Sequence, residues 1–253
     1  MSYDVTIDPD ARYQDGPNGG LVGYLSTSSA FNCSATGNVI GGDWATGGLV
    51  GYGRQSTVAR CYASGNVSGY EHVGGLIGYY EPRAEYSLED CYATGNVVSS
   101  GSSTDDCSAG GLIGLWNQYD LVLDGHIKNV YSTGSVSAPN LPAEAGGGLI
   151  GQIDYGTGVV ALNAYWDTET SGQATSQGGA TGKTTAEMKA NCPSPAWPNA
   201  RASTAVNSSP NPCPASRAAS SHIELRPTRR NQPPLAGGMN PTAGGPDTLN
   251  PVT

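Results

Sequence analysis

Phenylalanine, charged side chains and long apolar runs are all scarce in this sequence of 253 residues. There is one phenylalanine, and Asp, Glu, Lys and Arg together make up 13% of the chain. No stretch approaches the roughly 18 consecutive apolar residues that a membrane-spanning helix needs, so we expect no membrane insertion. The opening residues, MSYDVTIDPDARYQDG, contain no apolar segment typical of a signal peptide. We therefore expect a fragment of a longer exported protein, or export by some other signal.

Positive charge is also scarce outside the C-terminal part of the chain. Residues 1–192 hold 7 Lys and Arg against 19 Asp and Glu, whereas residues 193–253 hold 5 against 2. An acidic body excludes nucleic acid as a partner. The six cysteines form no CxxC pair of the kind that structural zinc sites use. ATGKTT, at 180–185, lacks the first glycine of a phosphate-binding loop, because Gln177 stands there. We expect no cofactor and no metal.

Glycine and tyrosine are abundant, and both recur in two short motifs. GGLVGY and its variants begin at residues 19, 47, 74, 110 and 147. CSATGNV, CYASGNV and CYATGNV begin at residues 33, 61 and 91, and weaker copies, VYSTGSV and AYWDTET, begin at 130 and 164. The two motifs therefore alternate five times along the chain, which is the sequence pattern of a repeat architecture.

Each motif reads as a short strand bounded by turn residues. A unit of two or three short strands buries its apolar face only when successive units stack. We therefore predict an all-β fold, a short right-handed parallel β-solenoid of about five coils. The expected segments are a lead-in strand or cap (1–18), the coils (19–170), a terminal segment with a short helix (171–192) and a Pro-rich disordered tail (193–253). Thr184 and Glu187 fit a capping box at the start of that helix.

Alternation along the cysteine motif predicts which side chains face inward. Cysteine, alanine and valine face the interior, and the cysteine position is filled by Val130 and Ala164 in the later copies. The outward positions form a possible binding surface: Tyr62, Tyr92, Tyr131, Tyr165, Thr36, Ser64, Thr94 and Thr133. Asn38, Asn66 and Asn96 either belong to that surface or form a ladder of turns bonded to the backbone.

The glycine motif poses a harder question, because its leucine is always followed by Val or Ile. Strict alternation would expose this row, and an exposed apolar stripe is typical of an interface. The alternative is that the flanking glycines bend the chain so that both side chains turn inward, or that loops cover the row. The possible interface stripe consists of Val22, Val50, Ile77, Ile113 and Ile150.

GGLVGY, GGLIGY and CYATGNV resemble the GLUG-motif repeats of bacterial surface proteins, which include adhesins and filamentous-haemagglutinin-like passengers. The resemblance covers about residues 15–190 and implies an extracellular or cell-surface β-rich module. Some relatives also carry a zinc peptidase with an HExxH motif. This sequence has His72, His126 and His222 and no such motif, so peptidase activity does not transfer.

The function we predict is a non-enzymatic structural or adhesive module of a secreted or cell-surface bacterial protein. Its partners would be glycans or proteins of a host or neighbouring cell, or other modules of the same parent protein. A Thr/Ser row on a regular face leaves an ice- or carbohydrate-binding solenoid open. A polysaccharide-cleaving β-helix is less favoured, with Asp167 and Glu169 as its best carboxylate pair. The acidic residues Asp8, Asp10, Asp15 and 105–106 match no calcium-loop spacing.

Overall fold

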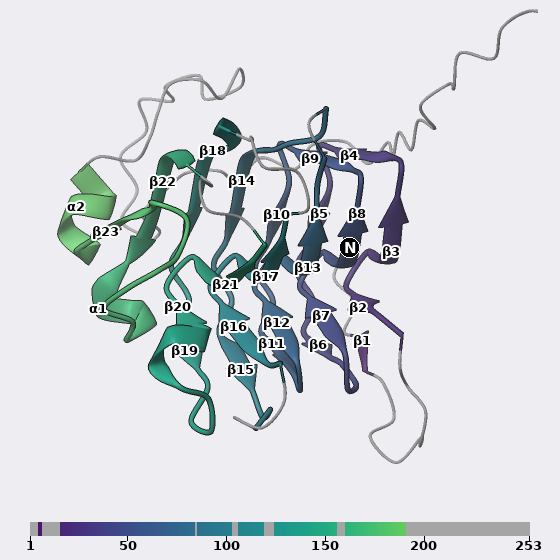
Figure 1. The fold of residues 1–253 in the computed structure, drawn as a ribbon. Helices are drawn as coiled ribbons and strands as arrows, with labels where there is room; N and C mark the ends of the chain where they lie inside the picture. Colours follow the sequence, from purple (N-terminus) through teal and green to yellow (C-terminus); the bar gives the residue numbers. More distant parts are fainter. Residues whose placement is uncertain are drawn as a thin grey trace, which may run out of the picture.

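The fold is a stack of coils, in a computed structural model that describes residues 5–6, 16–83, 85–102, 106–118, 124–155 and 160–190. The coils follow one another from the N-terminal end of the stack to the far end, where two short helices lie (Figure 1). This confirms the predicted all-β parallel solenoid with a short terminal helix. The tail predicted to be disordered, and most of the lead-in segment, lie outside the described residues.

Each coil adds strands to four sheets, which we call A, B, C and D. Sheet A consists of β1 (Val5–Thr6), β6 (Val39–Ile40), β11 (Val67–Gly69), β15 (Val97–Ser99) and β19 (Val136–Ser137). Sheet B consists of β2 (Asn18–Gly19), β7 (Ala45–Gly47), β12 (His72–Gly74), β16 (Ser108–Gly110) and β20 (Gly146–Gly147). Sheet C consists of β3 (Val22–Ser26), β8 (Val50–Arg54), β13 (Ile77–Glu81), β17 (Ile113–Asn117) and β21 (Ile150–Asp154). Sheet D consists of β4 (Ser29–Phe31), β5 (Ser34–Ala35), β9 (Thr57–Ala59), β10 (Tyr62–Ala63), β14 (Leu88–Ala93), β18 (Asp124–Ser132), β22 (Val160–Asp167) and β23 (Thr181–Lys183).

Neighbouring coils pair in parallel, with equivalent motif positions side by side. In sheet A, Val67 pairs with both Val39 and Val97. In sheet D, Tyr92 pairs with Tyr62 and with Tyr131. Each repeated sequence position therefore becomes a straight row that runs along the stack.

Two hydrophobic cores fill the interior. The larger lies between sheets C and D and includes the leucine row, the cysteine row and the buried aromatic rings of Tyr80 and Trp116. The smaller lies between sheets A and B and is built from the valine row, completed by Val73 and Ala109. No single coil has a closed core of its own, so stacking is what removes these side chains from water.

Glycine lets sheet C pass directly against sheet B. A Cβ added to Gly78 would lie 2.5 Å from the backbone nitrogen of Thr46, and one added to Gly114 would lie 2.7 Å from that of Val73. Real Cβ atoms do not approach backbone so closely. The third glycine of GGLVGY is therefore required by the contact between the two backbones.

The leucine and the following Val or Ile lie where the chain turns from sheet B into sheet C. The N–H groups of Leu49 and Val50 both donate to the carbonyl of Leu76, at 2.9 and 3.0 Å, which interrupts the alternation of side chains. Equivalent paired bonds occur in the neighbouring coils. Both side chains consequently turn inward: Val50, Ile77, Ile113 and Ile150 are 0% exposed, and Val22 in the first coil is partly buried. The interface interpretation of this stripe is therefore wrong.

The far end of the stack is closed by α1 (Thr168–Ser171), α2 (Thr185–Ala190) and the segment between them. The hydroxyl of Ser176 accepts hydrogen bonds from the N–H groups of Leu149 and Ile150, at 3.2 and 2.9 Å. At α2 the predicted capping box forms, with Glu187 accepting from the N–H of Thr184 at 2.9 Å. In the last coil, side chains therefore accept backbone hydrogen bonds that the next strand accepts in the earlier coils.

Candidate functional site

The cysteine row is part of the core. Cys61 and Cys91 are fully buried, and Cys33 nearly so. Each thiol donates to the carbonyl two residues before it, as Cys61 does to Ala59 at 3.2 Å. The thiol of Cys61 also accepts from the N–H of Cys33, at 3.4 Å. A hydrogen bond with Cys61 and burial raise the pKa of the Cys33 thiol, which therefore stays protonated.

No disulfide joins the cysteines in the described part of the chain, where Cys107 is a fourth buried free thiol. Among the described residues no group of three or more His, Cys, Asp or Glu side chains is placed to hold a metal ion. Asp8, Asp10 and Asp15 lie outside those residues.

The tyrosines of the cysteine motif form a ladder on the outside of sheet D. The rings of Tyr62 and Tyr92 lie 4.9 Å apart at an interplanar angle of 2°, and those of Tyr92 and Tyr131 lie 5.0 Å apart at 1°. Tyr62 and Tyr165 are half-buried, whereas Tyr92 and Tyr131 are only 7% and 6% exposed. The outward direction matches the expectation, but the two central rings offer little surface because they stack on their neighbours.

Two neighbours close off the same ladder near its C-terminal end. Met188 of α2 packs in one cluster with the tyrosines. The ammonium group of Lys183 lies 5.9 Å from the centre of the Tyr165 ring. Burial raises the pKa of Tyr92 and of Tyr131, so both hydroxyls remain protonated at neutral pH.

The row beside the ladder is open to solvent. Thr36, Ser64 and Thr94 are exposed and Thr133 is half-exposed. The asparagines that follow form the predicted turn ladder: the side-chain oxygen of Asn38 accepts from the N–H of Asn66 at 2.9 Å, and Asn66 does the same for Asn96 at 3.0 Å. Their amide oxygens are therefore committed to the backbone.

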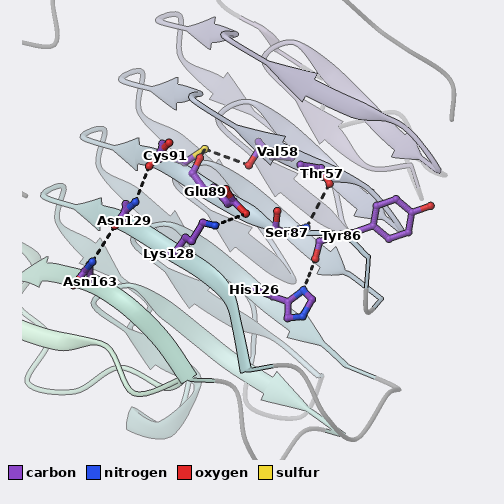
Figure 2. A network of polar contacts seen from close by, with 11 residues as sticks. Thr57, Val58, Tyr86, Ser87, Glu89, Cys91, His126, Lys128, Asn129 and Asn163 are labelled. Carbon is purple, nitrogen blue, oxygen red and sulfur yellow. Dashed lines mark hydrogen bonds and ion pairs between the residues drawn. The ribbon is translucent and has the colours of Figure 1, made fainter. Parts of the chain in front are cut away.

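A second set of side-chain ladders runs across the outside of sheet D (Figure 2). Asn163 donates to Asn129 at 3.0 Å, and Asn129 donates to Asp90 at 2.9 Å. Beside them, Lys128 forms an ion pair with Glu89 at 3.0 Å. Polar side chains on this face form hydrogen bonds and an ion pair with the next coil, so the network links neighbouring coils.

The carboxylates considered for glycoside cleavage are engaged in capping. Asp167 is 2% exposed and accepts from the N–H groups of Glu169 and Thr170, at 3.0 and 3.2 Å, and from the hydroxyl of Thr185 at 2.7 Å. Glu169 accepts from the N–H of Thr185 at 2.9 Å. The pair holds α1 and α2 against the last coil, and its geometry gives no open cleft between two free carboxyl groups.

The tyrosines of the glycine motif gather elsewhere, on the outside of sheet C beside sheet B. Tyr24 and Tyr52 stack at 5.0 Å with an angle of 28°, and Tyr52 meets Tyr79 edge-on at 4.8 Å and 85°. The ring centre of Trp44 lies 5.2 Å from that of Tyr52 and 5.7 Å from that of Tyr79. We call Tyr24, Trp44, Tyr52 and Tyr79 the aromatic cluster.

A shallow hollow of about 410 Å³ opens over this cluster, lined by Tyr24, Tyr52, Arg54, Glu81 and Arg83. Glu81 is buried, and it accepts from the Tyr52 hydroxyl and from Nε of Arg54, the latter at 3.3 Å. Burial and the hydrogen bond to Glu81 raise the pKa of Tyr52. Arg54 and Arg83 are exposed at its rim.

His72 lies beneath the cluster, in sheet B. Its ring is 5.4 Å from that of Tyr79, and its Nδ1 lies 3.1 Å from the hydroxyl of Ser108. Burial lowers the pKa of His72 to about 4, against a smaller opposing effect from Asp106. The imidazole is therefore neutral at physiological pH.

The repeat pattern alone does not predict the hollow. The tyrosine of GGLVGY recurs in the first three copies and is replaced by Leu115 and Gln152 in the last two. This change along the sequence is the feature that distinguishes the first three coils, where the hollow lies, from the last two. The alternation of side chains does not predict the corner between sheets B and C. This corner brings Trp44 and His72 against the tyrosine rings.

The fold, with its in-register rows and shared cores, is that of a repeat protein of the parallel β-solenoid class. A family model described as "The GLUG motif" matches residues 19–40 and 42–68, each close to one coil. The chain is a GLUG-repeat protein.

One curated relative is Halomucin of Haloquadratum walsbyi, 34% identical over 179 residues. The match covers 67% of this chain but spans only 2% of Halomucin. No solved structure matches. Among the described residues, none of the helices has the length and apolar character needed to cross a membrane.

Proposed function

We propose that this chain is a non-enzymatic structural module of a secreted or cell-surface protein, and that its outer face makes adhesive contacts. The observation that carries this proposal is the stack itself: each of the four sheets continues from coil to coil in parallel, with one shift of register between β18 and β22. Such a stack is a stiff spacer that presents each repeated outer side chain at the strand spacing of about 4.8 Å. The GLUG repeats and the similarity to a short stretch of Halomucin support the same conclusion.

Contact would be multivalent, because equivalent side chains recur from coil to coil. Thr36, Ser64 and Thr94 are exposed in successive coils and offer hydroxyls to a glycan or a protein of a neighbouring cell. Several weak contacts of this kind add through effective concentration. The engagement of Asp167 and Glu169 in helix capping supports a module without hydrolytic activity.

The test is detection on intact cells of the source organism. An antibody raised against the folded chain should label unpermeabilised cells or the culture medium, and external protease should remove the surface signal. Binding of the purified chain to a glycan array or to extracellular-matrix proteins would then separate an adhesive module from a plain spacer. An antigen found only inside the cells would overturn the proposal. So would release of sugar from a polysaccharide that is lost in Asp167→Asn.

A further inference from the structure

We propose that the hollow over the aromatic cluster binds a carboxylated sugar, with the pyranose ring against Tyr24 and its carboxylate on Arg54 and Arg83. This names a ligand class for the adhesive role proposed above and rests on it. Three features of the hollow carry the inference: an exposed aromatic face, two arginines at the rim, and a buried acid whose oxygens are already occupied.

Tyr24 supplies the aromatic face. It is 49% exposed, although it stacks on Tyr52, so a large part of its surface stays open. An aromatic ring held by its neighbours is a rigid apolar platform that loses little conformational entropy on binding. The C–H face of a pyranose ring is a suitable partner for such a platform, and a volume of about 410 Å³ accommodates one or two sugar units.

The arginines make the hollow positively charged. The described part of the chain holds three arginines, and two of them, Arg54 and Arg83, line this hollow in an otherwise acidic molecule. Among the described residues that line the hollow, the one acid is Glu81, which already accepts from Tyr52 and Arg54. Because Arg54 forms an ion pair with Glu81, the excess positive charge of the lining is that of Arg83. Guanidinium groups bind carboxylates through paired N–H donors, so a uronate or sialate group fits better than a neutral sugar.

The test is isothermal titration calorimetry, which measures the affinity of the full chain for trigalacturonate in buffer of moderate ionic strength. The fully methyl-esterified trisaccharide is the matched neutral ligand, and an oligoglutamate of the same charge is the matched acidic peptide. We expect the acid to bind, the ester to bind at least about tenfold more weakly, and the peptide to bind poorly because it lacks a ring for Tyr24.

Variants then locate the site. Arg83→Gln and Tyr24→Ala should each weaken binding about tenfold or more. Arg60→Gln removes an exposed arginine between β9 and β10, and Tyr62→Ala removes a half-exposed ring of the ladder. Both should bind like the unchanged chain.

Four outcomes would overturn the inference: no binding of trigalacturonate at millimolar concentration, equal binding of the ester, equal binding of oligoglutamate, or loss of binding in Tyr62→Ala but not in Tyr24→Ala. None of these removes the proposed surface role, which depends on labelling of intact cells. If the chain proves intracellular while trigalacturonate still binds as expected, the adhesive role fails and the binding site remains.

Discussion

The two tyrosine rows of this solenoid come from equally regular motifs, yet they differ in geometry. The ladder on sheet D is a parallel stack, with interplanar angles of 1° and 2°. The aromatic cluster on sheet C is tilted, with angles of 28° and 85° between successive rings. The ladder buries its central rings, whereas the cluster leaves Tyr24 half-exposed in the lining of a hollow that also contains charged residues.

The surroundings of each row explain this difference. Along the ladder the tyrosines pair directly with one another in register, Tyr62 with Tyr92 and Tyr92 with Tyr131. Beside the cluster, sheet B changes in every coil: the position of Ala45 is taken by His72 and then by Ser108. Trp44 adds a ring in one coil only. The repeat therefore sets where a tyrosine lies in the stack, and the residues around it decide whether its ring is buried or stays open to solvent.

The largest effect is expected beneath the ladder, at Cys61. Cys61→Asp should destabilise the fold by more than about 4 kcal/mol, because it places an unpaired charge in the core. Cys61→Ala should cost only about 1–2 kcal/mol as a modest cavity. Urea unfolding followed by circular dichroism would measure both. Equal tolerance of the two substitutions would show that the row is not interior.

The next effect compares the two tyrosine rows directly. Tyr131→Ala removes a ring that is 6% exposed and should cost about 3 kcal/mol. Tyr24→Ala removes a ring with a largely open face and should cost less than about 1 kcal/mol. The same unfolding experiment applies to both variants. If Tyr24→Ala were the more destabilising, the cluster would be the structural row and the ladder the open one.

Much of the fold could be predicted from the repeats, because in-register stacking turns each sequence position into a row. The inward cysteines, the asparagine turn ladder and the capping box of Thr184 and Glu187 all follow from local rules. The Val/Ile stripe did not, because alternation fails at the corner where Leu49 and Val50 share one carbonyl. The repeats also do not predict the hollow, since its lining comes from several coils and Arg54, Glu81 and Arg83 lie outside both motifs.

The third effect depends on pH and concerns the base of the aromatic cluster. The pKa of His72 is about 4 in the folded chain and about 6.5 in the unfolded chain, so the unfolded state takes up the proton first as pH falls. The contribution of the neutral imidazole is complete above pH 6.5 and is lost towards pH 4. Because this contribution is lost, the free energy of unfolding should fall by about 2 kcal/mol between pH 7 and pH 5.

His72→Gln is the control, because glutamine does not titrate in this range. Denaturant unfolding of both proteins at a series of pH values should show a shallower dependence for the variant between pH 7 and pH 5. Asp106 favours protonation and makes the loss smaller than burial alone would produce. Parallel curves for the two proteins would mean that His72 is accessible to protons in the folded state.

The smallest effect tests how much the polar ladders contribute to holding the coils together. Asn96 accepts from the N–H of Ser135 at 3.0 Å, and Asn96→Ala leaves that N–H without its partner at an exposed turn. The cost should be about 1 kcal/mol, as for one solvent-accessible hydrogen bond. Asn96→Asp keeps an oxygen acceptor and should recover most of the loss. If alanine and aspartate were equally destabilising, side-chain packing at the turn would matter more than the hydrogen bond. The polar ladder would then stabilise the stack in the same way as the stacked tyrosine rings, through contact between equivalent groups in successive coils.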